Sequence, residues 1–258
     1  MNTYKIKRIL RSIIIIILFC ILVYDNYIKP QDSTLIEAPV QEQVELETIQ
    51  AFQSGEEIKW NGETIPAYSG QPYVAIHNNV PFFDTESKTL IEFEEYSPLD
   101  NLGRCGVAYA NICKALMPTE SRESIRDVKP SGWNNVPYKG LVEGDYLYNR
   151  CHLIGFQLAG ENANPQNLIT GTRYLNVQGM LPFENMVADY VKETGNHVLY
   201  RVTPVFVDDE LVARGVVIEA EDVEEDGEDI LFCVFVYNVQ PGIEINYKDG
   251  SSRLIKGE

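Results

Sequence analysis

Hydrophobic and polar positions divide the chain into a leader, a polar stretch and a longer patterned region. The first apolar run, Ile13 to Val23, is almost unbroken and follows a basic flank that starts at Lys5. Such an arrangement is typical of an export signal whose N-terminus stays inside. The run is short for a membrane span, which favours a signal peptide, yet no small-x-small cleavage site follows it. We therefore predict that residues 1–24 are a signal peptide or an uncleaved signal anchor. Both alternatives place the rest of the protein outside the cytoplasm, secreted or held at the cell surface.

A polar, acidic and weakly periodic stretch follows over residues 25–56. This composition suits an acidic linker that tethers a folded region. The globular part is expected to start near Ile58, so the sequence predicts one folded domain over residues 57–258. Its length is sufficient for a hydrophobic core.

The domain begins with short apolar segments, of which two are predicted as strands and one as a helix. Tyr73–Ile76 and Val80–Phe83 have the composition of strands and flank the turn-forming pair Asn78-Asn79,. Gly106–Leu116 is predicted as a helix that ends before Pro118, because proline cannot continue a helix,. The first half of the domain is therefore expected to mix strands with one helix.

The middle of the domain is expected to contain two short extended segments. Asp145–Asn149 is predicted as a strand that leads into His152, and Leu168–Thr170 is predicted as the second segment. Between them, Leu153–Leu158 is expected to continue as a strand or the start of a helix, and Gly160–Gln166 has the composition of a loop,. Thr170 or Thr172 is well placed to cap a following helical turn,.

A helix is predicted next, with Pro182 in its first turn, where proline is tolerated,. Gly195 can end this helix, since glycine readily adopts the left-handed conformation that follows a helix. One face is apolar, as expected for a helix that packs on a core. That face consists of Phe183, Met186, Val187, Tyr190 and Val191.

Three strand-like segments complete the pattern: His197–Val207, Leu211–Glu219 and Ile230–Asn238. They alternate with acidic turns, as in an antiparallel meander. The sequence therefore predicts an α+β fold.

Composition adds information about the cysteines. Four remain beyond Cys20, and a protein outside the cytoplasm usually pairs its cysteines,. The close paired spacing of a structural zinc site is absent. Disulfides and free buried thiols are both open, and the four cysteines allow three full pairings. They are Cys105, Cys113, Cys151 and Cys233.

The net charge of −17 argues at first against a polyanionic substrate, because like charges repel. Much of the excess lies in Asp208–Glu210, in Glu219–Asp229 and in the linker. The segment from Arg104 to Arg173 is balanced or slightly basic, which leaves room for a local basic cleft. Its basic residues are Arg104, Lys114, Arg122, Arg126, Lys129, Lys139, Arg150 and Arg173.

The strongest candidate for chemistry is the stretch Asn149-Arg150-Cys151-His152, which lies between two apolar runs. A histidine can accept a proton near neutral pH, and a neighbouring guanidinium can hold a phosphate. Adjacent residues of a strand point to opposite faces, so Cys151 and His152 are not expected to form a nucleophile–base pair. Cys151 is expected to pack or pair behind the catalytic face, with Cys105 as one partner. The alternative for His152 is a structural histidine.

Two downstream residues favour the catalytic interpretation. Asn176 and Glu184 offer the oxygen ligands or water-holding groups that Mg2+ prefers,. Their spacing of eight residues keeps them on one side only if the backbone stays close to helical, which Gly179 and Pro182 make uncertain.

In these residues the chain resembles the DNA/RNA non-specific endonucleases of the ββα-metal type, especially the streptococcal secreted and membrane-held DNases. That family carries an Asp-Arg-Gly-His motif, then a metal-binding Asn, and a Glu eight residues later. Here Asn149 to His152 occupy the motif, with Asn for Asp and Cys for Gly. Asn176 and Glu184 follow with the family's spacing. The resemblance covers roughly residues 60–240.

The resemblance implies an α+β fold with a ββα-metal (His-Me finger) core, an antiparallel sheet and flanking helices. It also implies a Mg2+-dependent endonuclease, with Mn2+ as a substitute metal and no small-molecule cofactor. Asn176 would bind the metal, which would contact a non-bridging phosphate oxygen and the leaving 3′ oxygen. His152 would deprotonate the attacking water, Arg150 would brace the phosphate and Glu184 would hold water around the metal.

The expected substrate is DNA, with RNA as an open alternative. A site that contacts phosphates and not bases would cleave with little sequence preference. The resemblance also implies that cleavage leaves 5′-phosphate ends. Arg173 is the candidate for a further substrate contact, its alternative being a surface arginine. The membrane is a partner only through an uncleaved N-terminal segment.

Two other functions remain to be tested. One is a catalytically weakened nuclease-like protein that binds nucleic acid, in which Asn149 and Cys151 mark decay. The other is a surface interaction protein whose acidic turns bind a cationic partner. Retention of His152, Asn176 and Glu184 argues against the first, and the second leaves these three residues unexplained.

Overall fold

The structure is a computed structural model, and it describes residues 57–255. These residues belong to one compact unit of the chain, Glu45–Glu258. The predicted signal segment (1–24) and acidic linker (25–56) lie outside the described residues. Among residues 57–255, no helix is both long and apolar enough to cross a membrane.

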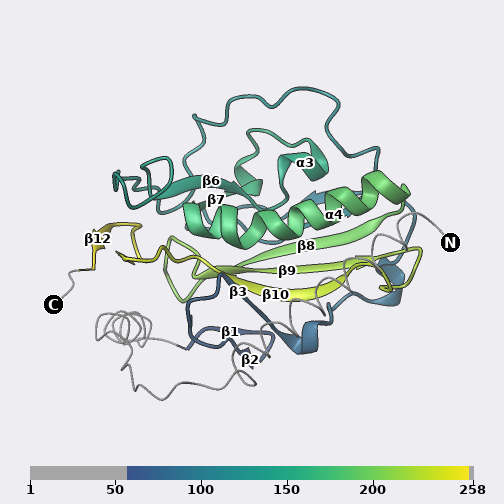
Figure 1. Cartoon of the computed structure of the whole chain (residues 1–258), viewed down its shortest axis with the longest axis horizontal. Coiled ribbons are helices and arrows are strands. Elements are labelled where there is room, and N and C mark those ends of the chain that lie inside the picture. Colours follow the sequence, from purple (N-terminus) through teal and green to yellow (C-terminus); the bar gives the residue numbers. More distant parts are fainter. Residues whose placement is uncertain (1–56, 256–258) are drawn as a thin grey trace, which may run out of the picture. The chain divides into compact units, whose positions relative to one another are not determined.

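A six-stranded antiparallel sheet forms the centre of the fold (Figure 1). Its strand order is β3-β10-β9-β8-β5-β4. The predicted meander is confirmed, since β8, β9 and β10 follow one another in both the sequence and the sheet. The strands are β3 Tyr73–Ala75, β4 Glu94–Tyr96, β5 Ala108–Ile112, β8 Val198–Val205, β9 Gly215–Asp222 and β10 Leu231–Tyr237.

Both faces of this sheet are covered, and its central strands β8, β9 and β10 are buried at nearly every position. On one face of β10, Phe232 packs against Phe183 of the long helix, with ring centroids 4.9 Å apart. On the other face, Phe235 belongs to a buried cluster with Ile65 and Tyr68 from the start of the domain. Successive side chains of a strand point to opposite faces, so β10 contributes to two cores.

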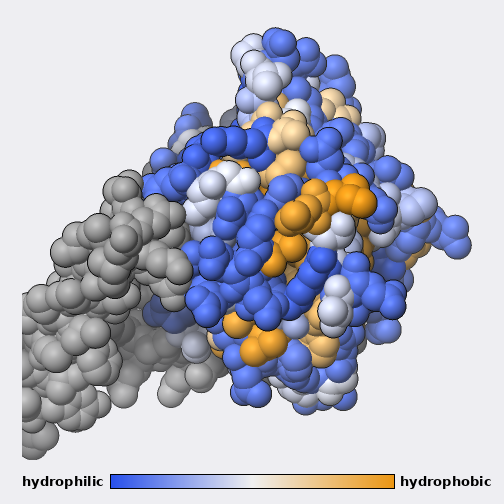
Figure 2. Space-filling view, turned by 90° about the vertical axis from the view of Figure 1, so that its right-hand side faces the viewer, coloured by the Kyte–Doolittle hydropathy of each residue, from blue (hydrophilic) through white to orange (hydrophobic). Residues whose placement is uncertain are grey.

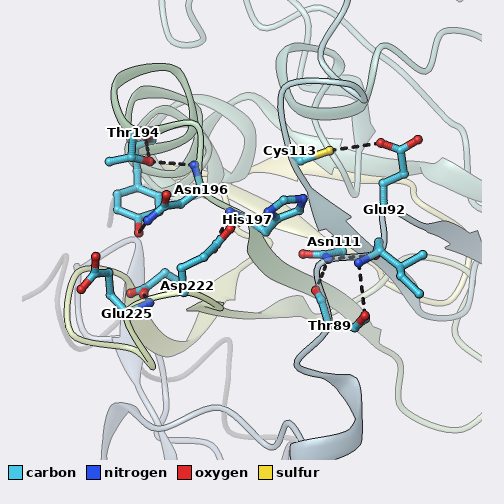
Figure 3. Close-up of polar contacts among 12 residues, drawn as sticks. Thr89, Glu92, Asn111, Cys113, Thr194, Asn196, His197, Asp222 and Glu225 are labelled. Atoms are coloured by element: carbon cyan, nitrogen blue, oxygen red, sulfur yellow. Dashed lines mark hydrogen bonds and ion pairs between the residues drawn. The ribbon is translucent and has the colours of Figure 1, made fainter.

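The predicted helix over Gly106–Leu116 is wrong, because this segment contains β5. Its apolar run is short, and periodicity alone does not separate a strand from a buried helix at that length. Backbone pairing with β8 on one side and with β4 on the other stabilises the strand conformation of this segment. The buried Asn111 side chain donates to the carbonyl oxygens of Thr89 and Ile91, which holds these residues against β5 (Figure 3).

Val80–Phe83 is likewise not a strand, although β3 confirms the first half of that prediction. The Phe82 N–H donates to Glu219 and its carbonyl accepts from Arg201. Two side chains of the central sheet therefore occupy the backbone groups that a strand partner would have used.

Strands β6 (Tyr148–His152) and β7 (Leu168–Thr172) lie beside helix α4 (Leu181–Thr194), which separates them from the central sheet, and the three elements form a ββα unit (Figure 1). Strand β6 pairs antiparallel with β7. The connection between them holds the short helix α3 (Phe156–Ala159) and the 3-10 turn Pro165–Asn167. After β7, a π-helical stretch, η5 (Leu175–Met180), continues directly into α4.

The predicted ends of this helix are confirmed. Pro182 lies in the first turn of α4, as predicted. The predicted threonine cap belongs to the preceding stretch, where Thr172 Oγ1 accepts a hydrogen bond from the Leu175 N–H,. Gly195 ends the helix in the left-handed conformation, with φ of 79°. The residues of the predicted apolar face are buried except for Met186, which is 48% exposed.

Smaller elements complete the described chain: β1 Lys59–Trp60 with β2 Glu63–Thr64, β11 Ile243–Ile245 with β12 Ser252–Leu254, and the 3-10 turns His77–Asn79 and Thr85–Ser87. The observed architecture is thus α+β with a ββα nuclease-type core, an antiparallel sheet and flanking helices, as predicted.

The four cysteines of the described residues are all free and buried. The suggested pairing of Cys151 with Cys105 is wrong, because Cys105 Sγ instead approaches the carbonyl oxygens of Pro165 and Leu168 at 3.2 Å each. On the face shown in Figure 2, hydrophilic residues predominate and hydrophobic residues form small separate groups.

Candidate active site

One cleft contains all five residues that the sequence singled out. It has a volume of about 580 Å3 and lies where β6, the end of β7 and the η5–α4 helix meet. Residues that are up to 34 positions apart along the chain thus come together around one space. The five are Arg150, His152, Arg173, Asn176 and Glu184.

His152 is buried at the end of β6, and its two ring nitrogens have different partners. Nε2 lies 2.9 Å from the carbonyl oxygen of Asn162, which can only accept, so Nε2 carries the proton,. In the neutral ring Nδ1 then holds the lone pair, and Arg122 Nη2 lies 3.3 Å from it. Burial lowers the pKa of His152 below its ordinary value of 6.5, and the charge of Arg122 lowers it further. The ring is therefore neutral at pH 7 and able to accept a proton.

Arg122 is the functional candidate that the sequence did not single out. Its guanidinium reaches His152 and lies over the Phe156 ring, 5.9 Å from the centroid. It comes from an irregular segment, so no periodic pattern marks it. The only available signal was the basic character of the segment between Arg104 and Arg173.

Arg150 connects the same irregular segment to β6. Its guanidinium donates to the carbonyl oxygens of Val128 and Arg126 and lies 4.2 Å from the Trp133 ring centroid. Two of its three nitrogens are thereby engaged, and Nη1 is left for a ligand in the cleft. Arg150 thus fixes the chain that presents Arg122.

The π-helical stretch explains how Asn176 and Glu184 share the cleft. In an ideal α-helix, residues eight apart differ by about 80° around the axis, at 3.6 residues per turn. A π turn takes more residues per turn, so it rotates less at each residue and reduces this difference. Neither Gly179 nor Pro182 breaks the helix, since η5 continues into α4.

Glu184 is a buried carboxyl group without an ion pair among the described residues. Gly155 lies directly against it, and a Cβ at position 155 would be 2.6 Å from Oε2. Burial raises the pKa of Glu184 to about 7, although a hydrogen bond from Gln157 and the charge of Arg122 oppose this shift. A carboxyl group that titrates near neutral pH in a cleft is a marker of a functional site.

Three polar side chains form a chain of hydrogen bonds at the other side of the cleft. Asn149 Oδ1 accepts from Arg173 Nη1 at 3.3 Å and from Asn176 Nδ2 at 3.1 Å. Arg173 also lies 3.5 Å from the exposed Glu143 carboxylate. Since the amide nitrogen of Asn176 is engaged, its Oδ1 is the atom available to a cation.

The cleft residues fit a hard divalent cation bound mainly by oxygen and water. Asn176 offers an amide oxygen and Glu184 a carboxyl group within the same cleft,. Among residues 57–255, no group of three or more His, Cys, Asp or Glu side chains is arranged to hold a metal. A cage of several anionic protein ligands is therefore not the type of site that these residues form.

Cys151 takes no part in this cleft. Its side chain is fully buried and packs against Gly171 of β7, where a Cβ would approach Sγ to 2.4 Å. Burial raises the pKa of its thiol, and a buried neutral thiol is a poor nucleophile,.

Comparison with known proteins gives one family and several similar structures. The family model described as DNA/RNA non-specific endonuclease matches residues 84–224. The structure of NucA from Streptococcus agalactiae with magnesium bound is 24% identical, with a TM-score of 0.62 over 70% of this chain and 86% of that one. The metal-free NucA structure is 25% identical, with the same TM-score and coverage. The structure of Sda1 nuclease with bound zinc is 27% identical, with a TM-score of 0.60 over 72% of this chain and 97% of that one.

Proposed function

The chain belongs to the DNA/RNA non-specific endonuclease family and is a hydrolytic nuclease, and we propose that it is Mg2+-dependent and uses His152 as its general base outside the cytoplasm. The observation that carries this proposal is the state of His152. Its Nε2–H is held by the Asn162 carbonyl, and its Nδ1 lies 3.3 Å from Arg122 Nη2. Both His152 and Arg122 line the cleft that Asn176 and Glu184 also line. A neutral, oriented imidazole is what deprotonation of water requires.

In the proposed reaction, water attacks the phosphorus atom of a phosphodiester while His152 Nδ1 takes one of its protons. The new P–O bond forms as the bond to the 3′ oxygen breaks, which leaves a 5′-phosphate, and the released 3′ oxygen takes a proton from solvent water to become a 3′-hydroxyl. Arg122 lies beside His152 and would neutralise charge that develops on the phosphate,. Binding of the phosphate would also draw Arg122 away from Nδ1 and free the lone pair.

The remaining cleft residues have supporting roles. Arg150 would contact the phosphate through Nη1 while it holds the segment that presents Arg122. Arg173 would bind a neighbouring phosphate, and Glu184 would hold water in the cleft. A Mg2+ ion held by Asn176 would supply Lewis-acid stabilisation of the negative charge on the phosphate and the leaving oxygen. The bound magnesium in the NucA structure supports the choice of this ion, with Mn2+ as its expected substitute.

The local charge of the cleft resolves the objection from the acidic composition. Three arginines and one carboxyl group line it, although the whole protein carries −17. Cations beside phosphates hold the nucleic acid without reading bases, so we expect cleavage with little sequence preference, of DNA and also of RNA. The cleft cluster also favours a nuclease over a surface interaction protein, which would have no use for it.

The proposed setting, secreted or anchored at the cell surface, rests on the pattern of residues 1–24. Fusion of residues 1–56 to a reporter that is active only after export tests it. A reporter that stays inside the cell would contradict the setting without affecting the chemistry.

The decisive experiment compares the wild-type protein with His152→Ala on supercoiled plasmid and on RNA, with Mg2+ or with EDTA. Loss of a general base is expected to lower the rate about 100- to 10,000-fold. His197→Ala serves as the matched control, because His197 lies outside the cleft. Intact plasmid in Mg2+ at every wild-type concentration would refute the enzyme and leave the nucleic-acid-binding alternative. Equal cutting by His152→Ala would refute the assigned base.

A further inference from the structure

The hydrogen bonds around Asn149 fix the orientation of two amide groups. A guanidinium can only donate, so the atom of Asn149 that faces Arg173 must be its oxygen,. That same oxygen faces Asn176, which must therefore donate with its nitrogen. Arg173 thus determines which way both amides point, and no choice between amide oxygen and nitrogen remains.

Two groups are left for ligands by this arrangement. Asn176 Oδ1 is an acceptor that has no donor among the described residues, and Asn149 Nδ2 is a donor without an acceptor there. Both residues line the cleft. The oxygen suits a hard cation and the amide N–H2 suits a phosphate oxygen.

The charge around these groups does not favour a cation in the absence of nucleic acid. The cleft is lined by Arg122, Arg150 and Arg173, against the single carboxyl group of Glu184. Because both amides are neutral, neither offsets this positive charge. A divalent cation in such a cleft is stabilised only when an anion enters with it, and each phosphodiester brings one negative charge.

We propose that Asn149 is a positioning residue that aims Asn176 Oδ1 at the divalent cation and, being neutral, makes cation binding depend on bound nucleic acid. This inference rests on the proposed function and concerns its binding step. The dependence is reciprocal, so the cation also strengthens binding of the nucleic acid by the same factor. An aspartate at position 149 would keep both accepted hydrogen bonds and add a negative charge beside the cation.

The test measures Mn2+ binding by electron paramagnetic resonance, with and without a duplex oligonucleotide, in the full chain carrying His152→Ala to prevent cleavage. We expect Mn2+ to bind at least about 10-fold more tightly when the duplex is present, which corresponds to about 1.4 kcal/mol. Added to this background, Asn149→Asp is expected to tighten Mn2+ binding to the free protein about 10-fold and to reduce the effect of the duplex by a similar factor.

Two further variants separate positioning from charge. Asn149→Ala removes the acceptor that orients Asn176 and is expected to weaken Mn2+ binding both with and without the duplex. Asn101→Asp adds the same charge at an exposed turn residue that does not line the cleft, and it is expected to change neither value. Thermal unfolding of each variant verifies that the fold is retained.

Equal Mn2+ affinity with and without the duplex, or an Asn149→Asp protein that binds Mn2+ no more tightly than its parent, would overturn the inference. A retained Mn2+ affinity in Asn149→Ala would overturn the positioning role. These outcomes are distinct from failure of the proposed function, which is judged by plasmid cleavage with the wild-type protein and does not enter the binding measurement.

Discussion

Two buried glutamates illustrate the difference between the sheet and the cleft. Glu219 of β9 is fully buried and faces Arg201 of β8 directly across the ladder. It accepts two hydrogen bonds from that guanidinium, at 2.7 and 2.8 Å, and a third from the Phe82 N–H. Glu184 is buried to nearly the same extent and has no ion pair among the described residues, and burial raises its pKa to about 7.

The contrast shows how stability and function are distributed in this protein. A buried charge costs free energy unless it is paired and hydrogen-bonded. In the sheet, the ion pair with Arg201 compensates for the burial of Glu219. The hydrogen bonds from these two side chains to the backbone of Phe82 also fix the position of that segment. In the cleft, no ion pair among the described residues compensates for the burial of Glu184, so its carboxyl group remains available to water and to a cation. A buried carboxyl group without an ion pair is the better guide to the site.

Glu219→Gln is expected to produce the largest loss of stability. Removal of one partner from a buried ion pair leaves the other unpaired, and about 3 kcal/mol of the free energy of unfolding should be lost. Nuclease activity per folded molecule should stay at the wild-type level. Urea unfolding measures the stability, and plasmid cleavage measures the activity. A loss of less than about 1 kcal/mol in the free energy of unfolding would show that the ion pair with Arg201 does not stabilise Glu219 in this way.

Glu184→Gln makes the same chemical change in the cleft, and it should increase stability where Glu219→Gln decreases it. The folded pKa of about 7 lies above the ordinary value of 4.5, so the unfolded chain releases its proton first as pH rises. Stability is therefore lost between about pH 4.5 and 7, by up to roughly 3 kcal/mol for a difference of about 2.5 in pKa. In EDTA at pH 8, the variant should be about 2 kcal/mol more stable than wild type.

The same substitution should lower nuclease activity about 100-fold, because interactions made only in the transition state cost this much when removed. Urea unfolding in EDTA at pH 4.5 and pH 8 tests the stability change, which should disappear at the lower pH. A destabilised variant at pH 8 would show that Glu184 has a partner of the kind that Glu219 has.

His197→Ala should have the smallest effect and extends the comparison to the histidines. His197 Nδ1 lies 2.6 Å from Glu224, in a partly exposed pair at the end of the sheet (Figure 3). Such pairs contribute little, so we expect at most about 1 kcal/mol of lost stability. Cleavage should not change, in contrast to His152→Ala, and a fall in cleavage of more than 3-fold, on the order of 0.7 kcal/mol, would mean that the sheet end contributes to catalysis.

The parts of the fold that follow from local pattern were predictable from the sequence. The η5–α4 helix has a threonine that caps its first turn, and α4 has a proline in its first turn and a glycine directly after its last residue, all close together in the sequence. The strands of the meander alternate with turns in sequence order. Predictions failed where distant residues decide, as at Val80–Phe83, whose backbone groups are taken by Arg201 and Glu219. The register that places these two side chains opposite each other is not visible in the sequence.

The residues of the candidate site likewise fall into those that the sequence identified and those that only the fold shows. The motif from Asn149 to His152 and the spacing of Asn176 and Glu184 identified residues that the fold does bring together around one cleft. Arg122 was not identified, because it is 30 positions from His152 in a segment without regular structure. The role of Asn149 in orienting two neighbours also required the folded arrangement.

The contact between Gly155 and the Glu184 carboxyl group has a consequence for recognising this site in other sequences. A Cβ at position 155 would come to 2.6 Å from Glu184 Oε2 and 2.7 Å from its Cδ, so even an alanine there would displace the carboxyl group from its position. The four-residue motif is therefore shorter than the physical constraint, which extends from Asn149 to Gly155. A search pattern that requires glycine three positions after the histidine should reject proteins that carry the motif by chance and retain those in which a buried glutamate can occupy the cleft.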